Sequence, residues 1–210
     1  EINLLIVNLY PFAKTVSGGS DYSTCVENID IGGPAMLRAA AKNHKFVNVI
    51  TEIEDYKSLL EELEKNGGLT SYRFRRNLAL AAYARTASYD STVANWLRGY
   101  ADKKTKSYTV SGDLVQRLRY GENPHQTASF YKKGFSDFGL TSSKIWQGKE
   151  LSYNNINDAD SAIRLVTEFA SDVACVIIKH ANPCGVAIGK TVTEAYLSAF
   201  ECDKKSAFGG

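Results

Sequence analysis

The sequence predicts an α/β protein built from two successive domains. Three apolar runs rich in β-branched residues, at 2–7, 46–50 and 174–178, are typical of buried strands, and helical patterns follow each of them. The composition changes after Tyr100, where a short basic stretch without apolar periodicity is typical of an interdomain linker. The expected domains are therefore 1–111 and 112–210.

In the first domain we expect a strand at 2–7 that ends in a loop at 8–12, because Pro11 lacks the backbone donor that a strand ladder needs. Pro34 suits the first turn of the helix that follows. The last helix should break near Asp90, which could cap a second segment. Propensity and periodicity predict the remaining elements: a helix at 35–42, a strand at 46–50, a helix at 55–66 and helical structure at 69–100.

The second domain combines short strands with longer helices. The apolar run at 174–178 predicts a buried parallel strand that ends at Lys179. Asn157 is a candidate cap for the helix that precedes this strand. The expected elements are strands at 114–119, 128–131 and 143–147, a helix at 157–170, the strand to Lys179 and a helix at 193–202.

Composition and charge exclude several classes of function. The 25 Lys and Arg against 23 Asp and Glu leave a net charge of +2, too small for a sequence-independent grip on nucleic acid. The basic runs at 73–76 and 103–106 are typical of solvated surface, although either could face an anion. No run approaches the roughly 18 apolar residues that cross a bilayer, and no signal peptide is recognisable, so we expect a cytoplasmic protein. Four cysteines without a CxxC pair favour reduced thiols.

Lys179 and His180 are the first candidates for catalysis. They follow the most apolar run of the chain, and open α/β sheets bind ligands at the carboxyl ends of their strands. A neighbouring ammonium disfavours the imidazolium, which leaves a neutral imidazole able to accept a proton. The pair is therefore equipped as a general base, although a strand that ends in two solvated polar residues is the alternative.

Three further segments could bind an anion or a nucleotide, and one of them is the polar segment 154–160 just before a helix, where Asn157 could also simply be the cap. Gly32 and Gly33 precede a helix whose N-terminus offers backbone donors, with Asp30 and Lys42 as a candidate acid and base or as a cap and a surface charge. The loop at 119–126 concentrates directional donors suited to a phosphate or a heterocycle.

His180, followed by Pro183 and Cys184, faintly matches the zinc-binding signature of nucleobase deaminases. The signature needs a glutamate two residues after the histidine and a second cysteine, and the chain has Asn182 and Ala187 there. One His with one Cys does not fill a shell of three protein ligands, so we expect no catalytic metal.

Five segments, taken in order, resemble the family of bifunctional purine-biosynthesis enzymes that join an AICAR formyltransferase to an IMP cyclohydrolase. They are NLYPF at 8–12, IDIGG at 29–33, RAAAKNH at 38–44, RYGENPHQ at 119–126 and KHANPCG at 179–185. The resemblance implies that 1–111 is the C-terminal part of a methylglyoxal-synthase-like, Rossmann-like cyclohydrolase domain. It also implies that 112–210 begins a cytidine-deaminase-like formyltransferase domain, and that an internal fragment lacks contacts the family makes elsewhere.

For formyl transfer, the resemblance implies that His180 takes the proton of the AICAR amine as that amine attacks the formyl group of 10-formyltetrahydrofolate. Lys179 would stabilise the developing negative charge. Arg119 would hold the AICAR phosphate, and Tyr120 with Asn155 would position the nucleotide.

For ring closure of FAICAR to IMP, the resemblance assigns Tyr10 and Asn8 to the carbonyl and Asp30 and Lys42 to proton transfer. Ile31 and Gly32 would make backbone contacts to the base. It further implies a homodimer with AICAR, FAICAR and the folate as small-molecule partners and no nucleic acid or membrane. A regulatory nucleotide-binding module is the alternative, and it would give no role to Lys179 or His180.

Overall fold

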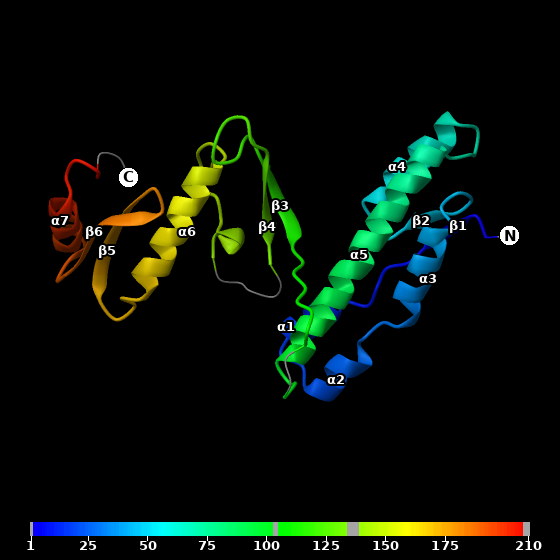
Figure 1. Cartoon of the computed structure of the whole chain (residues 1–210), viewed down its shortest axis with the longest axis horizontal. Helices are drawn as coiled ribbons and strands as arrows, with labels where there is room; N and C mark the ends of the chain where they lie inside the picture. The colour runs from blue at the N-terminus through cyan, green and yellow to red at the C-terminus, as the bar shows by residue number, and fades with distance from the viewer. Residues whose placement is uncertain (1, 103–104, 134–138, 208–210) are drawn as a thin grey trace. The chain divides into compact units, whose positions relative to one another are not determined.

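A computed structural model describes residues 2–102, 105–133 and 139–207 of the chain (Figure 1). These residues form two compact units. Unit 1 comprises 2–102, 105–112 and Lys133, and unit 2 comprises 113–132 and 139–207. Both units combine helices with small sheets, so the coarse prediction of an α/β fold is confirmed.

Unit 1 is a two-stranded parallel sheet with helices packed against it. Its elements are β1 (Leu4–Ile6), α1 (Phe12–Ser17), α2 (Tyr22–Glu27), α3 (Gly32–Lys42), β2 (Asn48–Ile50), α4 (Asp55–Lys65) and α5 (Tyr72–Arg98). Leu5 pairs with Val49 in the parallel register. The core brings β2, α3, α4 and α5 together through Leu37, Val49, Ile50, Leu59 and Leu78. A second cluster joins Phe12 of α1, Cys25 of α2 and Tyr89 of α5.

Three predictions for unit 1 were wrong. The strands are shorter than the apolar runs, because β1 and β2 pair over three residues only. The helices α1 and α2 were not predicted, since Pro11 was interpreted as part of a loop, whereas it precedes the first turn of α1. The break expected at Asp90 is absent, because the buried Tyr89 fixes this part of α5 in the core and no Gly or Pro interrupts the ladder.

One arginine of the basic run at 73–76 binds the backbone that follows α3. Arg75 donates through Nε to the carbonyl of His44 (3.0 Å) and through Nη2 to the carbonyl of Lys45 (2.9 Å). Its Nη1 donates to the hydroxyl and the carbonyl of Thr70. The guanidinium therefore satisfies carbonyls just beyond the end of α3, which leaves Arg73 and Arg76 as the exposed members of the run.

The expected linker is partly tied to α5. Lys103 and Lys104 lie outside the described residues, while Thr109 is bonded to Ser91 through the two hydroxyls (3.0 Å) and to the Asn95 amide through its carbonyl (3.2 Å). Arg98 reaches the carbonyl of Ser107 at 3.4 Å. These contacts fold the segment back along the C-terminal half of α5.

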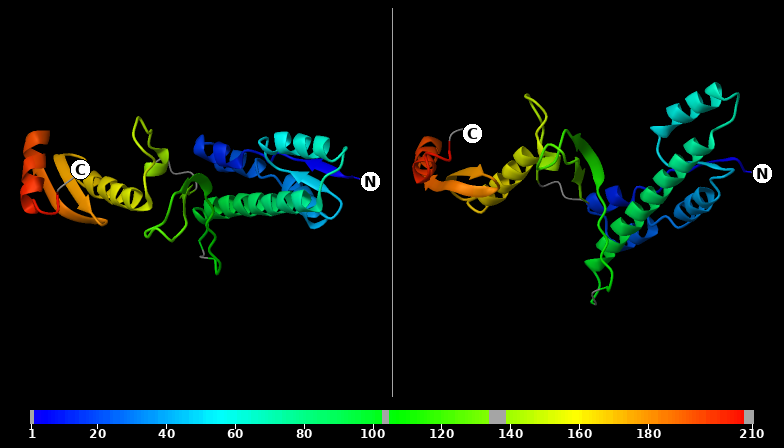
Figure 2. Two further views of the ribbon diagram at one scale, coloured as in Figure 1. Left: turned by 90° about the horizontal axis from the view of Figure 1, so that it is seen from above. Right: turned by 45° about the horizontal axis from the view of Figure 1, so that its top comes forward.

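Unit 2 places a β-hairpin between two helices. Its elements are β3 (Asp113–Leu118), β4 (Ala128–Lys132), the 3₁₀ turn η1 (Leu140–Ser142), α6 (Tyr153–Thr167), β5 (Val173–Lys179), β6 (Asn182–Gly189) and α7 (Val192–Cys202). The β5–β6 hairpin lies between α6 and α7 (Figure 2). The strands β3 and β4 form a separate antiparallel pair.

The apolar run before Lys179 was predicted as a buried parallel strand, and that prediction was wrong. β5 is half-buried and pairs antiparallel with β6, which was not predicted. A parallel pair needs a crossover of a dozen or more residues, whereas His180 and Ala181 alone connect these strands. Two further predictions for unit 2 were wrong. No strand forms at 143–147. The helix α6 begins at Tyr153 and is capped by Ser152, whereas the sequence indicated Asn157 as the candidate cap.

Two glycines allow α7 to lie close to β6. A Cβ at Gly185 would collide with the backbone carbonyl of Ala199, and a Cβ at Gly189 would lie 2.6 Å from the backbone nitrogen of Ala195. Ala195 and Ala199 are both fully buried. Small residues on both elements therefore set the distance between the helix and the strand.

In the described part of the chain, no helix is long and apolar enough to cross a membrane.

Gly185→Ala should destabilise unit 2, because the added methyl group meets backbone atoms that have no rotamer by which to move away. We expect the free energy of unfolding, measured by urea denaturation, to fall by about 3 kcal/mol or more. Gly32→Ala is the matched control, since its Cβ would meet nothing within 4 Å and should change stability by less than about 0.5 kcal/mol. Equal effects of the two substitutions would contradict the packing argument.

Candidate functional site

The Lys179–His180 pair lies at the tip of the β5–β6 hairpin. Lys179 is the last residue of β5 and is half-buried, and His180 is exposed in the connecting turn. His180 (φ 54°) and Ala181 (φ 58°) both adopt the left-handed conformation, as a two-residue hairpin turn of the primed type requires. Glycine and asparagine favour this conformation, whereas alanine adopts it at a cost of about 1–2 kcal/mol. The turn that carries the candidate base is therefore strained.

A carboxylate from α6 holds this turn. Asp158 accepts a hydrogen bond from the backbone N–H of Ala181 at 2.7 Å. Asn182 adds a second contact by donating from its amide to the carbonyl of His180 at 2.8 Å. The neighbourhood of Lys179 includes Asp203, whose pKa is lowered mainly by hydrogen bonds from Ser206 and to a smaller extent by the charge of Lys179.

The start of α6 carries Asn155, a predicted site residue, in a capping box. Ser152 accepts from the backbone N–H of Asn155 (3.3 Å), and the Asn155 Oδ1 accepts from the backbone N–H (3.4 Å) and the hydroxyl (2.8 Å) of Ser152. The carbonyl side of the Asn155 amide is therefore occupied by the cap. Its Nδ2 has no partner among the described residues and is the part available to a ligand.

The loop at 119–126, which carries Arg119 and Tyr120, is held by its own backbone. Gly121 donates to the carbonyl of Gln126 (2.8 Å), and Asn123 donates to the side-chain oxygen of Gln126 (2.7 Å). The Arg119 guanidinium lies 5.9 Å from the centre of the Tyr120 ring. A rigid loop therefore presents a cation beside an aromatic ring, a combination that suits a phosphate next to a planar base.

Both segments are anchored to the first turns of α6. The Asn154 amide donates to the carbonyl of Glu122 at 3.3 Å, and the Asp158 carboxylate accepts a hydrogen bond from the N–H of Ala181. Asn154 and Asp158 are four residues apart, so they share one helix face and are separated by about 6 Å along the axis. The structure thus brings the loop of Arg119 and the turn of His180 to neighbouring positions around Asn155.

Asn154 and Asp158 were predicted only as members of the polar segment 154–160, and neither was given a role of its own. Asn154 lies before the helix predicted at 157–170 and Asp158 lies in its first turn, where asparagine and aspartate are equally typical of caps. The spacing of four residues would have marked a shared face only if the helix had been started at Tyr153. The misplaced helix start therefore hid the signal.

In unit 1, Asp30 connects the two segments that carry the other candidates. Its carboxylate accepts from the backbone N–H of Tyr10 (3.2 Å) and of Gly33 (2.7 Å), which joins the loop after β1 to the start of α3. The backbone N–H of Asp30 donates to the hydroxyl of Tyr89 at 2.7 Å. A Cβ at Gly33 would lie 2.5 Å from Oδ2 of Asp30, so only glycine leaves room for the carboxylate.

The candidates around Asp30 share one end of the sheet. Tyr10 and Ile31 are exposed there at 56% and 77%, and Asn8 is exposed directly after β1. Gly32 begins α3 at the same end. Lys42 is the last residue of that helix, about 15 Å along its axis from Gly32, so the structure does not bring it to the group around Asp30.

Thr51 is a residue that the sequence did not indicate. It follows β2 directly, is 4% exposed, and its hydroxyl has no hydrogen-bond partner among the described residues. The bond from the Val7 N–H to the Ile50 carbonyl (3.1 Å) places it at the strand end that also leads to Asn8. The signal in the sequence is a single polar residue after an apolar run, which is too common to select.

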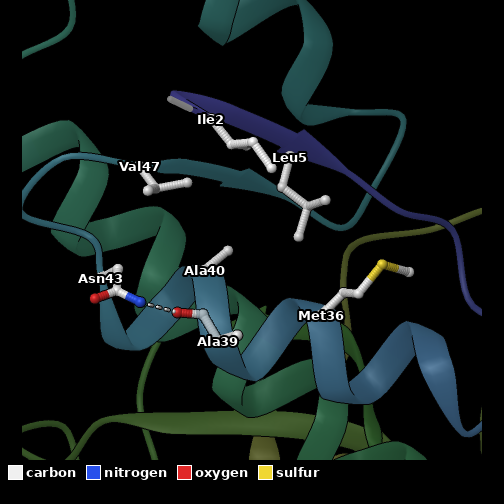
Figure 3. A pocket seen from close by; sticks show the side chains of 7 residues that line it. All are labelled: Ile2, Leu5, Met36, Ala39, Ala40, Asn43 and Val47. Atoms are coloured by element: carbon white, nitrogen blue, oxygen red, sulfur yellow. Dashed lines mark hydrogen bonds between the residues drawn. The ribbon is translucent and has the colours of Figure 1, made fainter.

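A groove of about 280 Å³ lies elsewhere on unit 1, between β1 and α3 (Figure 3). Side chains from both elements point into it, and none of them is charged. Its lining residues are Ile2, Leu5, Met36, Ala39, Ala40, Asn43 and Val47. An apolar lining does not suit a phosphate, so we do not assign the substrate to this groove.

The described residues contain no group of three or more His, Cys, Asp or Glu side chains that could hold a metal ion. The side chains named above offer groups for proton transfer, charge stabilisation and binding.

Comparison with known proteins identifies relatives over the whole chain. A family model described as "AICARFT/IMPCHase bienzyme" matches residues 40–210. The chain is 58% identical to the "Bifunctional purine biosynthesis protein PurH" of Cereibacter sphaeroides and 59% identical to that of Dinoroseobacter shibae. Each match covers 100% of this chain and 40% of the relative, so the chain spans about two fifths of the length of these relatives.

One solved structure, the crystal structure of ForH, is 34% identical to the chain. The match covers 50% of this chain and 54% of that one, with a TM-score of 0.40.

Tyr89→Phe should destabilise unit 1, because it leaves the half-buried N–H of Asp30 without its acceptor. We expect the free energy of unfolding at pH 7 to fall by about 1–2 kcal/mol. Burial raises the pKa of Tyr89 above 10.0, against the opposing effect of the Asp30 N–H. As the pH rises, Tyr89 therefore ionises at a lower pH in the unfolded chain than in the folded one. The free energy of unfolding of the wild type declines as the pH rises above about 10.

Phenylalanine does not titrate. The difference in the free energy of unfolding between wild type and Tyr89→Phe, measured by urea denaturation, should therefore narrow between pH 7 and about pH 10.5. Tyr22→Phe is the control for the loss of a tyrosine hydroxyl, since Tyr22 is 48% exposed, and its free energy of unfolding at pH 7 should stay within about 0.5 kcal/mol of wild type. Parallel profiles for wild type and Tyr89→Phe would contradict the assignment.

Proposed function

The chain belongs to the AICARFT/IMPCHase bienzyme family, and from that membership we propose that it is part of an enzyme of IMP biosynthesis. The first reaction transfers a formyl group from 10-formyltetrahydrofolate to AICAR and gives FAICAR. The second closes the ring of FAICAR with loss of water and gives IMP. One observation carries the proposal: the loop of Arg119 and the turn of His180 are both held to one face of α6.

We assign the two reactions to two domains. Residues 1–111 are the C-terminal part of the cyclohydrolase, with a methylglyoxal-synthase-like fold, and 112–210 begin the formyltransferase, with a cytidine-deaminase-like fold. The mixed helix and strand content of both units is compatible with these folds. The finer fold names rest on the resemblance of the sequence motifs.

In formyl transfer, the amine of AICAR attacks the formyl carbon while the His180 imidazole takes the amine proton. The Lys179 ammonium stabilises the negative charge that develops on the formyl oxygen. The carbon–nitrogen bond to the folate then breaks, and the folate nitrogen receives a proton. Arg119 binds the phosphate, and Tyr120 with the Nδ2 of Asn155 positions the nucleotide.

In ring closure, the carboxamide nitrogen of FAICAR attacks its own formyl carbon, so the reacting groups are already in one molecule. Support for the assigned residues comes from Asp30, which fixes the Tyr10 loop against the start of α3. The assignment of Lys42 as a base rests on the resemblance alone, because the length of α3 separates it from Asp30. The proposed residues are Asn8, Tyr10, Asp30, Ile31, Gly32 and Lys42.

The proposed enzyme is a cytoplasmic homodimer with AICAR, FAICAR and 10-formyltetrahydrofolate as its small-molecule partners. It uses the folate as a formyl donor and no catalytic metal. These properties follow from the resemblance of the motifs to the family.

His180→Ala in the full-length protein that carries this chain should abolish formyl transfer, because the amine loses its proton acceptor. We expect kcat to fall by about 10²- to 10⁴-fold, with AICAR binding, measured by calorimetry, nearly unchanged. His44→Ala is the control, since it removes an imidazole from unit 1, which has no proposed role in formyl transfer, and it should retain most of that activity. A regulatory module would show no catalytic change on either substitution.

The 210-residue chain alone should catalyse neither reaction efficiently, because it holds about two fifths of the length of its relatives. Steady-state assays of both half-reactions, with the full-length protein in parallel, measure this. Rates in the isolated chain equal to those of the full-length protein would overturn the proposal that essential contacts lie outside it.

A further inference from the structure

The turn that carries His180 is held in an unfavourable backbone conformation. Two successive residues that are not glycine, His180 and Ala181, have φ values of 54° and 58°. Alanine has no side-chain group with which to compensate locally, unlike the asparagine usual in such turns. The conformation persists only if the surroundings fix it, and strained turns of this kind cluster at functional sites.

The hydrogen bond from Ala181 to Asp158 connects the backbone of this turn to an element outside the hairpin. It is short, at 2.7 Å, and an ionised carboxylate makes such bonds stronger than a neutral acceptor does. Asn182 also stabilises the turn, but it is part of the hairpin and does not connect it to another element. Of Asp158 and Asn182, it is Asp158 that connects the turn to α6.

The location of Asp158 connects it to the proposed substrate site. It lies one turn after Asn154, which anchors the Arg119 loop, and three residues after Asn155. Residues three or four positions apart are neighbours on a helix surface, so Asp158 neighbours both Asn155 and Asn154. The same face of α6 therefore locates the nucleotide-binding groups and the base relative to each other.

We propose that Asp158 is a positioning residue for the Lys179–His180 pair: its carboxylate holds the left-handed turn and thereby sets the imidazole against the AICAR amine. This inference rests on the proposed function. Asp158 does not itself touch the reacting atoms. It acts through the backbone of Ala181, so its loss should lower kcat more than it raises KM.

The test uses the full-length protein with Asp158→Ala, Asp158→Asn and the double variant Asp158→Ala/Ala181→Gly. Asp158→Ala should lower kcat for formyl transfer by about 10- to 100-fold, with KM for AICAR changing by less than about threefold. Asp158→Asn keeps a side-chain oxygen that accepts from Ala181 and should recover most of the activity. Glycine adopts the left-handed conformation without strain, so the double variant should be more active than Asp158→Ala.

Asp160→Ala is the matched control, since Asp160 lies on the same helix but pairs with Arg164 at 2.7 Å. It should leave kcat unchanged. Hydrogen exchange of the Ala181 amide gives a readout independent of activity, and Asp158→Ala should accelerate it while Asp160→Ala does not.

The outcomes separate the two claims. If His180→Ala retains formyl transfer, the proposed function fails, and the exchange rate of Ala181 still decides whether Asp158 holds the turn. If His180→Ala is inactive but Asp158→Ala has wild-type kcat, the positioning role is overturned. The positioning role is also overturned if Asp158→Asn and the double variant are as impaired as Asp158→Ala. It is likewise overturned if Asp158→Ala leaves the hydrogen exchange of the Ala181 amide unchanged.

Discussion

Carboxylates that accept hydrogen bonds from backbone N–H groups are the interaction on which both candidate sites depend. In unit 2, Asp158 holds the turn between β5 and β6, and in unit 1, Asp30 joins the loop after β1 to the start of α3. The bonds from Ala181 to Asp158 and from Tyr10 to Asp30 link residues that are 23 and 20 positions apart in sequence. A backbone N–H offers a fixed direction, so a carboxylate bound to it locates a loop more firmly than a contact between two flexible side chains does.

The arrangement explains how short, irregular segments can present functional groups in a defined geometry. Arg119 and His180 both lie outside regular helices and strands, where the chain has few ladder bonds of its own. Their loops are fixed by α6, a helix with a complete capping box at its start. Rigid helices that support variable loops are a common solution for binding and catalysis.

Sequence patterns predicted most helices and the ends of the apolar strands, because those depend on local periodicity. They did not predict that β5 turns back onto β6, since an apolar run shows burial but not the direction of its partner. The left-handed turn at His180 and Ala181 lacks the glycine that would have marked it. The candidate residues in unit 2 were found as motifs, but Asp158 depends on tertiary geometry, for which the sequence offers only an ordinary polar helix start.

The close packing of Gly185 and Gly189 against α7 has a consequence for how the molecule assembles. β5, β6 and α7 occupy consecutive positions between Val173 and Cys202, so their contacts join residues close in sequence. Contacts of this kind have low loop-closure entropy and form early in folding. The hairpin and its helix can thus form as one local block, and α6, which directly precedes β5 in the chain, adds the bond from Asp158 to the turn.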